Sequence, residues 1–524
     1  MNRSPFTRFL VPALATVGAL LASLSAQAAT VVSDTTVSLS GHAGAVCNNG
    51  EPANMRVTTV ADGAGISDRW FIHLQGGGSC KDDQSCQDRW ENQQGNMKPS
   101  GYSSNGLPNL TRGGSPFDGY NTVQINYCSS DGWIGSRIGT VDGNGDPVIY
   151  NGTDTLVVDS AGPGTYAVHF RGKRIVDAAL DEIESLYSLS TTASEVVFAG
   201  KSAGSAGVQA HLDKVEDRFG ATANVRGLLM DTWVPFLPLA GTESEVRADL
   251  ASLGISTATI DQLLEFAFFD ADDNLQDMYD TANVWGAFNN TATEGHLGPE
   301  SCFDAISGLP SVIANPSHLM LCAVADFVLN PAYNDGVTPY LSTELLILRN
   351  FYDVAVGMAA FRLFPDHDGV DDAYAAAIGL ELTNEQALSE LKNYVDFDNT
   401  KNLIADQNSE LAVAFYSVLM PLTQSGMDAA AGAANVTVFS PGLEMTTQNC
   451  HFFNPGACSF PESQRRGVVI HGIVDIPYAY TQQVIQPYNT SALGPARTVK
   501  QFLQGWADRN STFDYSLVLD TKLP

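Results

Sequence analysis

The chain has few basic residues and few charged residues of any kind. Its 524 residues contain 27 Lys plus Arg against 58 Asp plus Glu, so the formal net charge is −31. Nucleic acids and anionic membrane surfaces attract clustered Lys and Arg, and we therefore expect this chain to bind neither of them. Only 16% of the residues are charged while 44% are hydrophobic, a composition that excludes global disorder.

Long hydrophobic runs are also lacking, except near the start of the chain. Arg3 and Arg8 flank the beginning of an apolar run, and Ala26 and Ala28 then occupy the small-residue positions of a cleavage site. This pattern predicts a signal peptide over residues 1–28, because the run is too short for a membrane anchor. No later segment has the roughly 18 uninterrupted apolar residues of a membrane helix. We expect a secreted or periplasmic protein that does not bind a membrane.

The eight cysteines include no Cys-x-x-Cys pair, the spacing typical of zinc sites. An even number of cysteines in an oxidising compartment instead predicts disulfides. Two pairs lie close enough in sequence to close short loops: Cys80 with Cys86, and Cys450 with Cys458. The cysteines that remain allow Cys47 to pair with Cys128 and Cys302 with Cys322, although spacing alone leaves other connectivities open. We expect no metal and no cofactor.

Short β-branched runs alternate with longer helical patterns, which predicts an α/β fold with a mostly parallel sheet covered by helices. An amphipathic helix is predicted over residues 172–186. Two Ala-, Asp- and Leu-rich stretches, about 240–340 and 355–435, are predicted to be helical insertions that cap the sheet or form a lid. No linker or repeat interrupts the chain, so residues 29–524 are expected to form a single domain. The predicted strands cover residues 70–74, 121–127, 195–199, 225–230, 345–348 and 436–439.

The pentapeptide Gly-Lys-Ser-Ala-Gly at 200–204 stands between a predicted strand and a helix predicted to begin near Ser205. This is the Gly-x-Ser-x-Gly pattern of a nucleophile elbow in its required context. A serine on so sharp a turn needs strained backbone angles, and its neighbours two positions away must be small. The pattern predicts Ser202 as a catalytic nucleophile, exposed at a helix N-terminus that favours a developing oxyanion.

A nucleophilic serine also needs backbone N–H groups that stabilise the oxyanion of the tetrahedral intermediate. The earlier predicted strand, 70–74, runs into three consecutive glycines at 76–78. We expect Gly77 and Gly78 to be two donors of the oxyanion hole, with the N–H of Ala203 as the third. A phosphate-binding loop is not favoured, because no Gly-Lys-Ser/Thr follows these glycines.

Four motifs occur in order between residues 70 and 235: Leu-Gln-Gly-Gly-Gly-Ser-Cys at 74–80, Asn-Tyr-Cys-Ser-Ser-Asp-Gly at 126–132, Phe-Arg-Gly-Lys-Arg-Ile at 170–175, and Gly-Lys-Ser-Ala-Gly-Ser at 200–205. This series resembles the pectin acetylesterase and Notum family of extracellular serine carboxylesterases. The resemblance implies an α/β-hydrolase-like fold with a Ser-His-Asp triad that works through an acyl-enzyme. The chain departs from the family at Gly78-Ser79, where an aromatic residue is usual, and at Ser205, where a second glycine is usual.

The general base must be a histidine, because its pKa lets it take and return a proton near neutral pH. In the chain order Ser, acid, His, the base follows the last strand, which selects His451 or His471. His451 follows Cys450 as in the Cys-His segment of the family that the chain resembles, so His451 is favoured and His471 is the alternative. We expect His73, within a strand, and His211, on the helix after the elbow, to be structural.

The acid of the triad orients the imidazole and stabilises the imidazolium. Asp353 follows the predicted strand 345–348 and resembles the family's strand-Tyr-Asp segment, so it is the favoured acid. Asp406, ahead of a helix that leads to the last strand, is the alternative. Asp231 is expected to support the elbow from behind.

The residues predict an exported serine carboxylesterase that hydrolyses acyl esters, and the resemblance implies an acetyl group, on a carbohydrate or similar substrate, as the favoured ester. Its triad would be Ser202, His451 and Asp353, and its only expected partner is the ester substrate. One alternative is a lipase or polyester hydrolase that acts on longer acyl chains. Another is a catalytically inactive binding protein on the same scaffold.

Overall fold

A ten-stranded sheet runs through the protein, which we describe from a computed structural model. The described residues are 29–62, 65–99, 111, 116–140, 156–159, 165–230, 242–252, 256–264, 271–288, 298–348 and 435–440, with isolated residues and short strands beyond residue 429. The predicted α/β fold with a mostly parallel sheet is confirmed. Its strands are β1 (Thr30–Ser38), β2 (Asn54–Asp62), β3 (Gly65–Ile66), β4 (Arg69–Leu74), β5 (Asn121–Ile125), β8 (Glu195–Lys201), β9 (Asn224–Met230), β10 (Leu345–Leu348), β11 (Val436–Ser440) and β14 (Leu517–Leu519).

The strand order is β1-β2-β5-β4-β8-β9-β10-β11-β14, with β3 paired to the outer part of β2. Strand β2 pairs antiparallel with β1 on one side and with β5 on the other. From β5 through β4 to β14, every pairing is parallel. This is the α/β-hydrolase-like arrangement, with antiparallel strands at one edge of a parallel sheet. The carboxyl ends of the parallel strands therefore lie at one edge of the sheet, where the loops that follow neighbouring strands can form a site.

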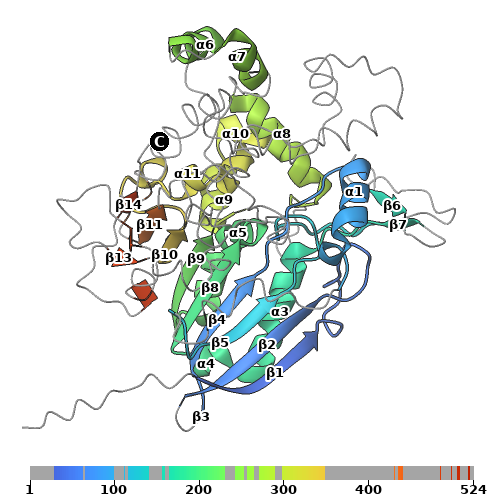
Figure 1. Ribbon diagram of the computed structural model, residues 1–524, viewed down its shortest axis with the longest axis vertical. Helices are drawn as coiled ribbons and strands as arrows, with labels where there is room; N and C mark the ends of the chain where they lie inside the picture. Colours follow the sequence, from blue (N-terminus) through green and yellow to red (C-terminus); the bar gives the residue numbers. More distant parts are fainter. Residues whose placement is uncertain are drawn as a thin grey trace, which may run out of the picture.

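Helices cover the sheet and its carboxyl edge (Figure 1). Helix α3 (Gly172–Tyr187) and helix α5 (Ala203–Phe219) are the long ones that pack on the sheet, and α4 (Leu189–Thr192) joins α3 to β8. Between β9 and β10, the stretch predicted to be helical forms a group of helices beyond the end of the sheet where α5 begins. They are α6 (Glu243–Ser252), α7 (Thr257–Leu264), α8 (Ala271–Val284), α9 (Glu300–Ile306), α10 (Pro310–Ala314) and α11 (Ala325–Val328), with the 3-10 helices η2 (Pro316–Ala323) and η3 (Pro331–Tyr333).

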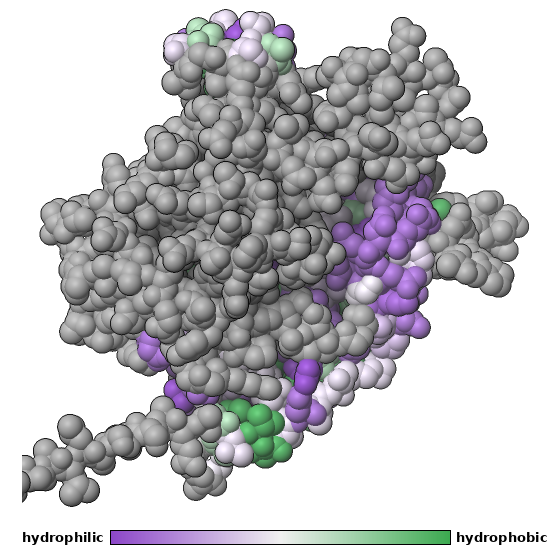
Figure 2. All heavy atoms as spheres, in the orientation of Figure 1, coloured by the Kyte–Doolittle hydropathy of each residue, from purple (hydrophilic) through white to green (hydrophobic). Residues whose placement is uncertain are grey.

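Two further pieces flank the sheet. Helix α1 (Asp83–Gln93) and the 3-10 helix η1 (Gln94–Asn96) follow β4, and α1 packs beside the small β6 (Val157–Asp159) and β7 (Thr165–Ala167) pair. Near the C-terminus, β12 (Val484–Ile485) pairs with β13 (Arg497–Thr498). In Figure 2 much of the described surface is hydrophilic, with a small hydrophobic patch near β3.

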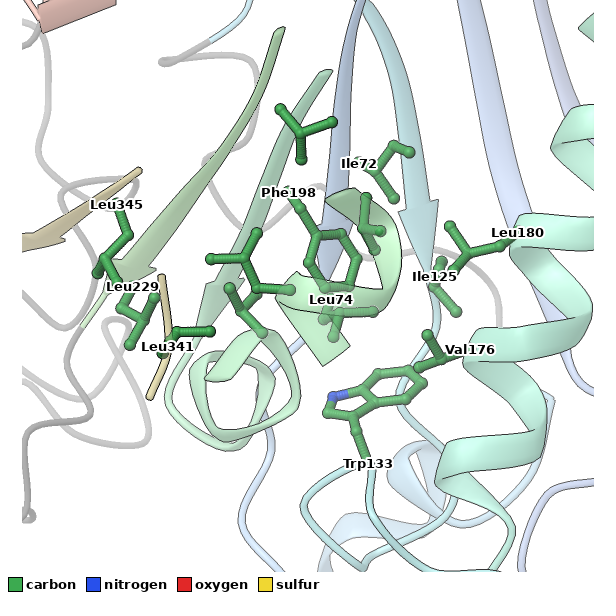
Figure 3. Packing of buried hydrophobic residues seen from close by; sticks show 14 of the residues in the cluster. Ile72, Leu74, Ile125, Trp133, Val176, Leu180, Phe198, Leu229, Leu341 and Leu345 are labelled. Atoms are coloured by element: carbon green, nitrogen blue, oxygen red, sulfur yellow. The ribbon is translucent and has the colours of Figure 1, made fainter. Parts of the chain in front are cut away.

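The main core lies between one face of the sheet and helices α3 and α5. Figure 3 shows Phe198 of β8 and Leu74 of β4 facing Trp133, with Val176 of α3 beside them. On α3 the buried apolar residues recur at helical spacing, which is why this segment forms a helix with one face on the sheet. Phe198 is fully buried, so Phe198→Ala would cost about 3–5 kcal/mol of stability.

The described residues contain three disulfides, and each joins a predicted pair: Cys47 with Cys128, Cys80 with Cys86, and Cys302 with Cys322. The predicted pair Cys450 and Cys458 lies outside the described residues. Within the described part of the chain, no helix has the length and apolar character needed to cross a membrane.

Candidate active site

The turn from β8 to α5 holds Ser202 in a strained backbone conformation. Ser202 has φ 51° and ψ −124°, and α5 begins at the next residue, Ala203. A non-glycine residue at positive φ costs free energy, and such residues are common where a site needs a side chain in a fixed direction. The N–H of Ser202 donates to the carbonyl of Met230 at 2.9 Å, which ties the turn to the end of β9.

The two glycines of the pentapeptide are required by close packing. A Cβ atom on Gly200 would lie 2.1 Å from the carbonyl oxygen of Gly204, and a Cβ on Gly204 would lie 2.1 Å from the carbonyl oxygen of Leu74. The first oxygen belongs to helix α5 and the second to strand β4, so neither can move without displacing one of these elements. The steric demand inferred from the sequence is therefore met by backbone contacts on both sides of Ser202.

Ser205, where the family usually has glycine, holds the elbow from behind. Its hydroxyl oxygen lies 2.6 Å from the carbonyl of Gly200 and 2.7 Å from the carbonyl of Met230, and it accepts a hydrogen bond from the N–H of Met230 at 2.9 Å. Ser205 is fully buried. The departure from the family pattern thus links the ends of β8 and β9 directly beneath Ser202.

The glycine-rich loop after β4 lies against the elbow. A Cβ atom on Gly76 would lie 2.3 Å from the carbonyl oxygen of Lys201 and 3.0 Å from the Cβ of Ser202. Gly78 has a φ of 71°, a left-handed conformation that favours glycine, and it is exposed like Ser79. The structure therefore brings together the segments that carry Ser202, Ala203, Gly77 and Gly78 at an accessible edge of the sheet.

The far end of this loop is fixed at Cys80. Its N–H donates to the carbonyl of Ser130 at 3.1 Å, and its carbonyl accepts from the indole N–H of Trp285 at 2.7 Å. The disulfide to Cys86 joins the same point to helix α1. Residues from three separate segments thus hold the loop from outside.

Asp131 is a fully buried acid in the turn that follows Tyr127 and Cys128. Its carboxylate accepts hydrogen bonds from the Ser129 hydroxyl at 2.6 Å and from the N–H groups of Trp133 at 3.0 Å and Gly172 at 2.7 Å. Burial raises its pKa to about 6, while these hydrogen bonds act in the opposite direction. Asp131 joins the 129–133 turn to the start of α3 and has no described contact with Ser202.

Two buried histidines lie near the elbow. Burial, with a smaller effect of Lys201, lowers the pKa of His73 to about 3, and burial with Lys214 lowers that of His211 to about 4. His211 donates from Nε2 to the carbonyl of Trp133 at 2.8 Å, whereas neither ring nitrogen of His73 has a hydrogen-bond partner among the described residues. Both imidazoles are therefore neutral and enclosed at neutral pH, as expected of structural residues.

The remaining predicted site residues lie outside the described part of the chain. These are the favoured base and acid, their alternatives and the residue after β9: His451, Asp353, His471, Asp406 and Asp231. Among the residues that the structure describes, no group of three or more His, Cys, Asp or Glu could hold a metal ion.

The described half of the site can orient a serine hydroxyl and present N–H groups to an oxyanion. The N–H of Ala203 opens a helix of 17 residues, so it has no partner within the helix and carries its positive dipole end. Two residues that contact the glycine loop were not predicted from the sequence. The Tyr127 hydroxyl donates to the Gly78 carbonyl at 2.7 Å, and the Arg89 guanidinium would lie 3.3 Å from a Cβ on Gly78. The only signal was the presence of Tyr127 in the Asn-Tyr-Cys-Ser-Ser-Asp motif.

Comparison with known proteins confirms the resemblance over the first part of the chain. Residues 25–233 match the pectinacetylesterase family model. Palmitoleoyl-protein carboxylesterase NOTUM of Schmidtea mediterranea is 28% identical over 157 residues, 29% of this chain and 25% of that protein. Pectin acetylesterase 11 of Arabidopsis thaliana is 24% identical over 186 residues, 35% of this chain and 41% of that protein. The chain thus spans well under half the length of these relatives.

A solved structure, that of the Wnt deacylase Notum from Drosophila, aligns with 79% of this chain and 84% of its own. The alignment has 17% sequence identity and a TM-score of 0.39.

Proposed function

We propose that this protein is an exported serine carboxylesterase in which Ser202 is the nucleophile. In this proposal residues 1–28 are a signal peptide and residues 29–524 form one catalytic domain. One observation carries the proposal: a serine at φ 51° opens helix α5 and lies in contact with the glycine loop that follows β4. The match of residues 25–233 to the pectinacetylesterase family supports the same chemistry.

In the proposed reaction, the hydroxyl of Ser202 attacks the ester carbonyl while a histidine takes its proton. The N–H groups of Gly77, Gly78 and Ala203 stabilise the tetrahedral oxyanion. The histidine then protonates the leaving alcohol, and water hydrolyses the acyl-enzyme by the same steps. We propose His451 as this base and Asp353 as its acid, with His471 and Asp406 as the alternatives.

We propose a short acyl group, with acetyl favoured. The described side chains nearest the loop are those of Tyr127, Asn96 and Arg89: a Cβ on Gly77 would lie 2.9 Å from the Tyr127 ring and 3.2 Å from Asn96, and one on Gly78 would lie 3.3 Å from the Arg89 guanidinium. A long acyl chain gains free energy from apolar enclosure, which the two polar side chains and the already buried ring of Tyr127 do not supply. A net charge of −31 would repel a polyanionic glycan such as pectin, so a less charged acylated glycan or small ester fits better.

Replacing Ser202 by alanine tests the nucleophile. We expect Ser202→Ala to lower kcat/KM for p-nitrophenyl acetate by at least about 10³-fold while the circular dichroism spectrum stays unchanged. Ser190→Ala serves as the matched control, because the Ser190 hydroxyl, in helix α4, donates to the Glu184 carboxylate and has no part in the proposed site. Full activity of Ser202→Ala would refute the proposal.

Two further assays separate the alternatives. A series of p-nitrophenyl esters from acetyl to palmitoyl would show kcat/KM falling with chain length for the proposed enzyme, and rising for a lipase or polyester hydrolase. A serine-directed fluorophosphonate should label Ser202. If the folded protein is not labelled, a binding protein on the same scaffold is favoured instead.

A further inference from the structure

The glycine loop at 76–78 needs support from outside itself. Three consecutive glycines have the largest backbone freedom of any tripeptide, so N–H groups on them point in fixed directions only if neighbouring groups hold them. Oxyanion stabilisation depends on donors that are already oriented before the reaction. Tyr127, which follows β5, contacts the middle of this loop, and so does Asn96.

Tyr127 touches the loop at two successive residues. Its hydroxyl donates to the carbonyl oxygen of Gly78 at 2.7 Å. Its ring lies against Gly77, where an added Cβ would be 2.9 Å from Cδ1 of the tyrosine. The N–H of Gly78 belongs to the peptide between these two contacts, so both contacts restrict its direction.

The direction of the hydroxyl proton is itself fixed. The N–H of Gly132 donates to the Tyr127 oxygen at 2.8 Å, which leaves the O–H proton for the Gly78 carbonyl. Burial, together with the nearby Asp131 carboxylate, raises the pKa of Tyr127 well above its ordinary value. The phenol therefore remains a neutral donor over the pH range of an esterase assay.

The ring is held as firmly as the hydroxyl. Tyr127 is 1% exposed, its centroid lies 5.0 Å from that of Trp133, and the guanidinium carbon of Arg89 lies 5.8 Å from the ring centroid. Arg89 is in turn bonded to the Ser130 hydroxyl at 2.7 Å and to Gln93 at 2.9 Å. The adjacent Cys128 is joined to Cys47 by a disulfide, which fixes the backbone.

From these contacts we propose that Tyr127 is a positioning residue of the oxyanion loop, and that its ring at Gly77 and its hydroxyl at the Gly78 carbonyl together set the direction of the Gly78 N–H between them. This inference rests on the proposed esterase function, because it assigns a role in stabilising the oxyanion of that reaction. Tyr127 touches neither substrate nor Ser202, and it acts only through the loop.

The test compares Tyr127→Phe with Tyr120→Phe. The Tyr120 hydroxyl is also buried and donates to the Glu195 carboxylate, but Tyr120 lies at the amino end of β5, roughly 20 Å along the strand from Tyr127. Each variant loses one buried hydroxyl, so losses of stability are comparable. Only Tyr127→Phe should alter the oxyanion loop.

We expect Tyr127→Phe to lower kcat for p-nitrophenyl acetate about 10- to 100-fold with KM nearly unchanged, because the loop acts on the transition state. Its affinity for a trifluoromethyl ketone, which forms a tetrahedral adduct with serine, should fall by a similar factor. Tyr120→Phe should keep the kcat of the unmodified protein. Incorporating 4-aminophenylalanine at position 127, which can still donate to the Gly78 carbonyl, should restore most of the kcat.

Three outcomes would overturn the role of Tyr127: a kcat of Tyr127→Phe within twofold of the unmodified protein, an equal loss in both variants, or a change in KM alone. If Tyr127→Phe unfolds at 25 °C, the same kcat ratios are measured at about 10 °C in trimethylamine N-oxide, which favours folded states. Ser202→Ala in the same assay separates the two proposals. Activity retained by Ser202→Ala refutes the esterase mechanism, whereas an inactive Ser202→Ala beside a fully active Tyr127→Phe refutes only the positioning role.

Discussion

Ser202→Gly should make the protein more stable than Ser202→Ala, while both variants lose activity. Ser202 has φ 51° and ψ −124°, a conformation in which a residue with a Cβ atom is strained and glycine is not. Both variants remove the hydroxyl and all of its contacts. The difference in unfolding free energy between them therefore has two contributions: the backbone strain at position 202 and the freedom that glycine adds to the unfolded chain.

The magnitude follows from two opposing contributions. A residue in a sparsely populated backbone region costs about 1–3 kcal/mol, which glycine relieves. Glycine also stabilises the unfolded chain relative to alanine by about 0.4–1 kcal/mol. The Gly variant should therefore exceed the Ala variant in unfolding free energy by about 1.3 kcal/mol, and by about 2.6 kcal/mol at most.

Urea unfolding of the two variants, followed by tryptophan fluorescence, measures this difference. The midpoint for Ser202→Gly should lie at higher urea with an unchanged slope, so that the shift reports stability. Ser190→Gly against Ser190→Ala, at an ordinary helical position in α4, should show the opposite order. If Ser202→Gly is the less stable of its pair, the elbow stores no strain and the reasoning is refuted.

Two further predictions concern buried polar groups beneath the site. The pKa of His73 is about 3 in the folded protein and 6.5 in the unfolded chain, so the unfolded state gains a proton first and stability is lost as the pH falls from 6.5 towards 3. Urea titrations at pH 7 and pH 5 should show that His73→Phe loses about 2 kcal/mol less over this interval than the unmodified protein, and equal losses would contradict the burial argument. Ser205→Ala leaves the Met230 N–H without its hydroxyl partner and should cost about 1–3 kcal/mol of unfolding free energy, whereas an unchanged urea midpoint would show that this hydroxyl does not hold the elbow.

Sequence patterning predicted most of the central sheet. Residues 345–348 coincide with β10, and the helix expected over 172–186 is α3, because buried parallel strands and amphipathic helices have clear hydrophobic periods. The strand predicted over 121–127 ends instead at Ile125. Beyond that point Asn126 and Tyr127 leave the strand to bond with β2 and with the oxyanion loop, contacts that no local pattern reveals.

Strands β1 and β2 were not predicted. Strand β1 is rich in β-branched Val and Thr, but every one of its residues is exposed or half-buried, so it has no buried hydrophobic face. It pairs with β2 through a register of hydrogen bonds at the antiparallel edge of the sheet. Pairing with β2 and the strand propensity of Val and Thr together form that part of the fold.

For the candidate site, the sequence by itself determined which residue types stand at the ends of β4 and β8, because a sharp strand-to-helix turn leaves a fixed pattern of glycines around one serine. It also suggested the cysteine pairs that the three described disulfides join, but spacing alone left other connectivities open. Only the tertiary structure decided that the glycine loop lies against the elbow. It also decided that Tyr127 bonds the loop at Gly78 and that Ser205 bonds the end of β9 at Met230. Those contacts join residues of different strands, and their strength depends on burial and on atomic distances, which exist only once the chain is folded.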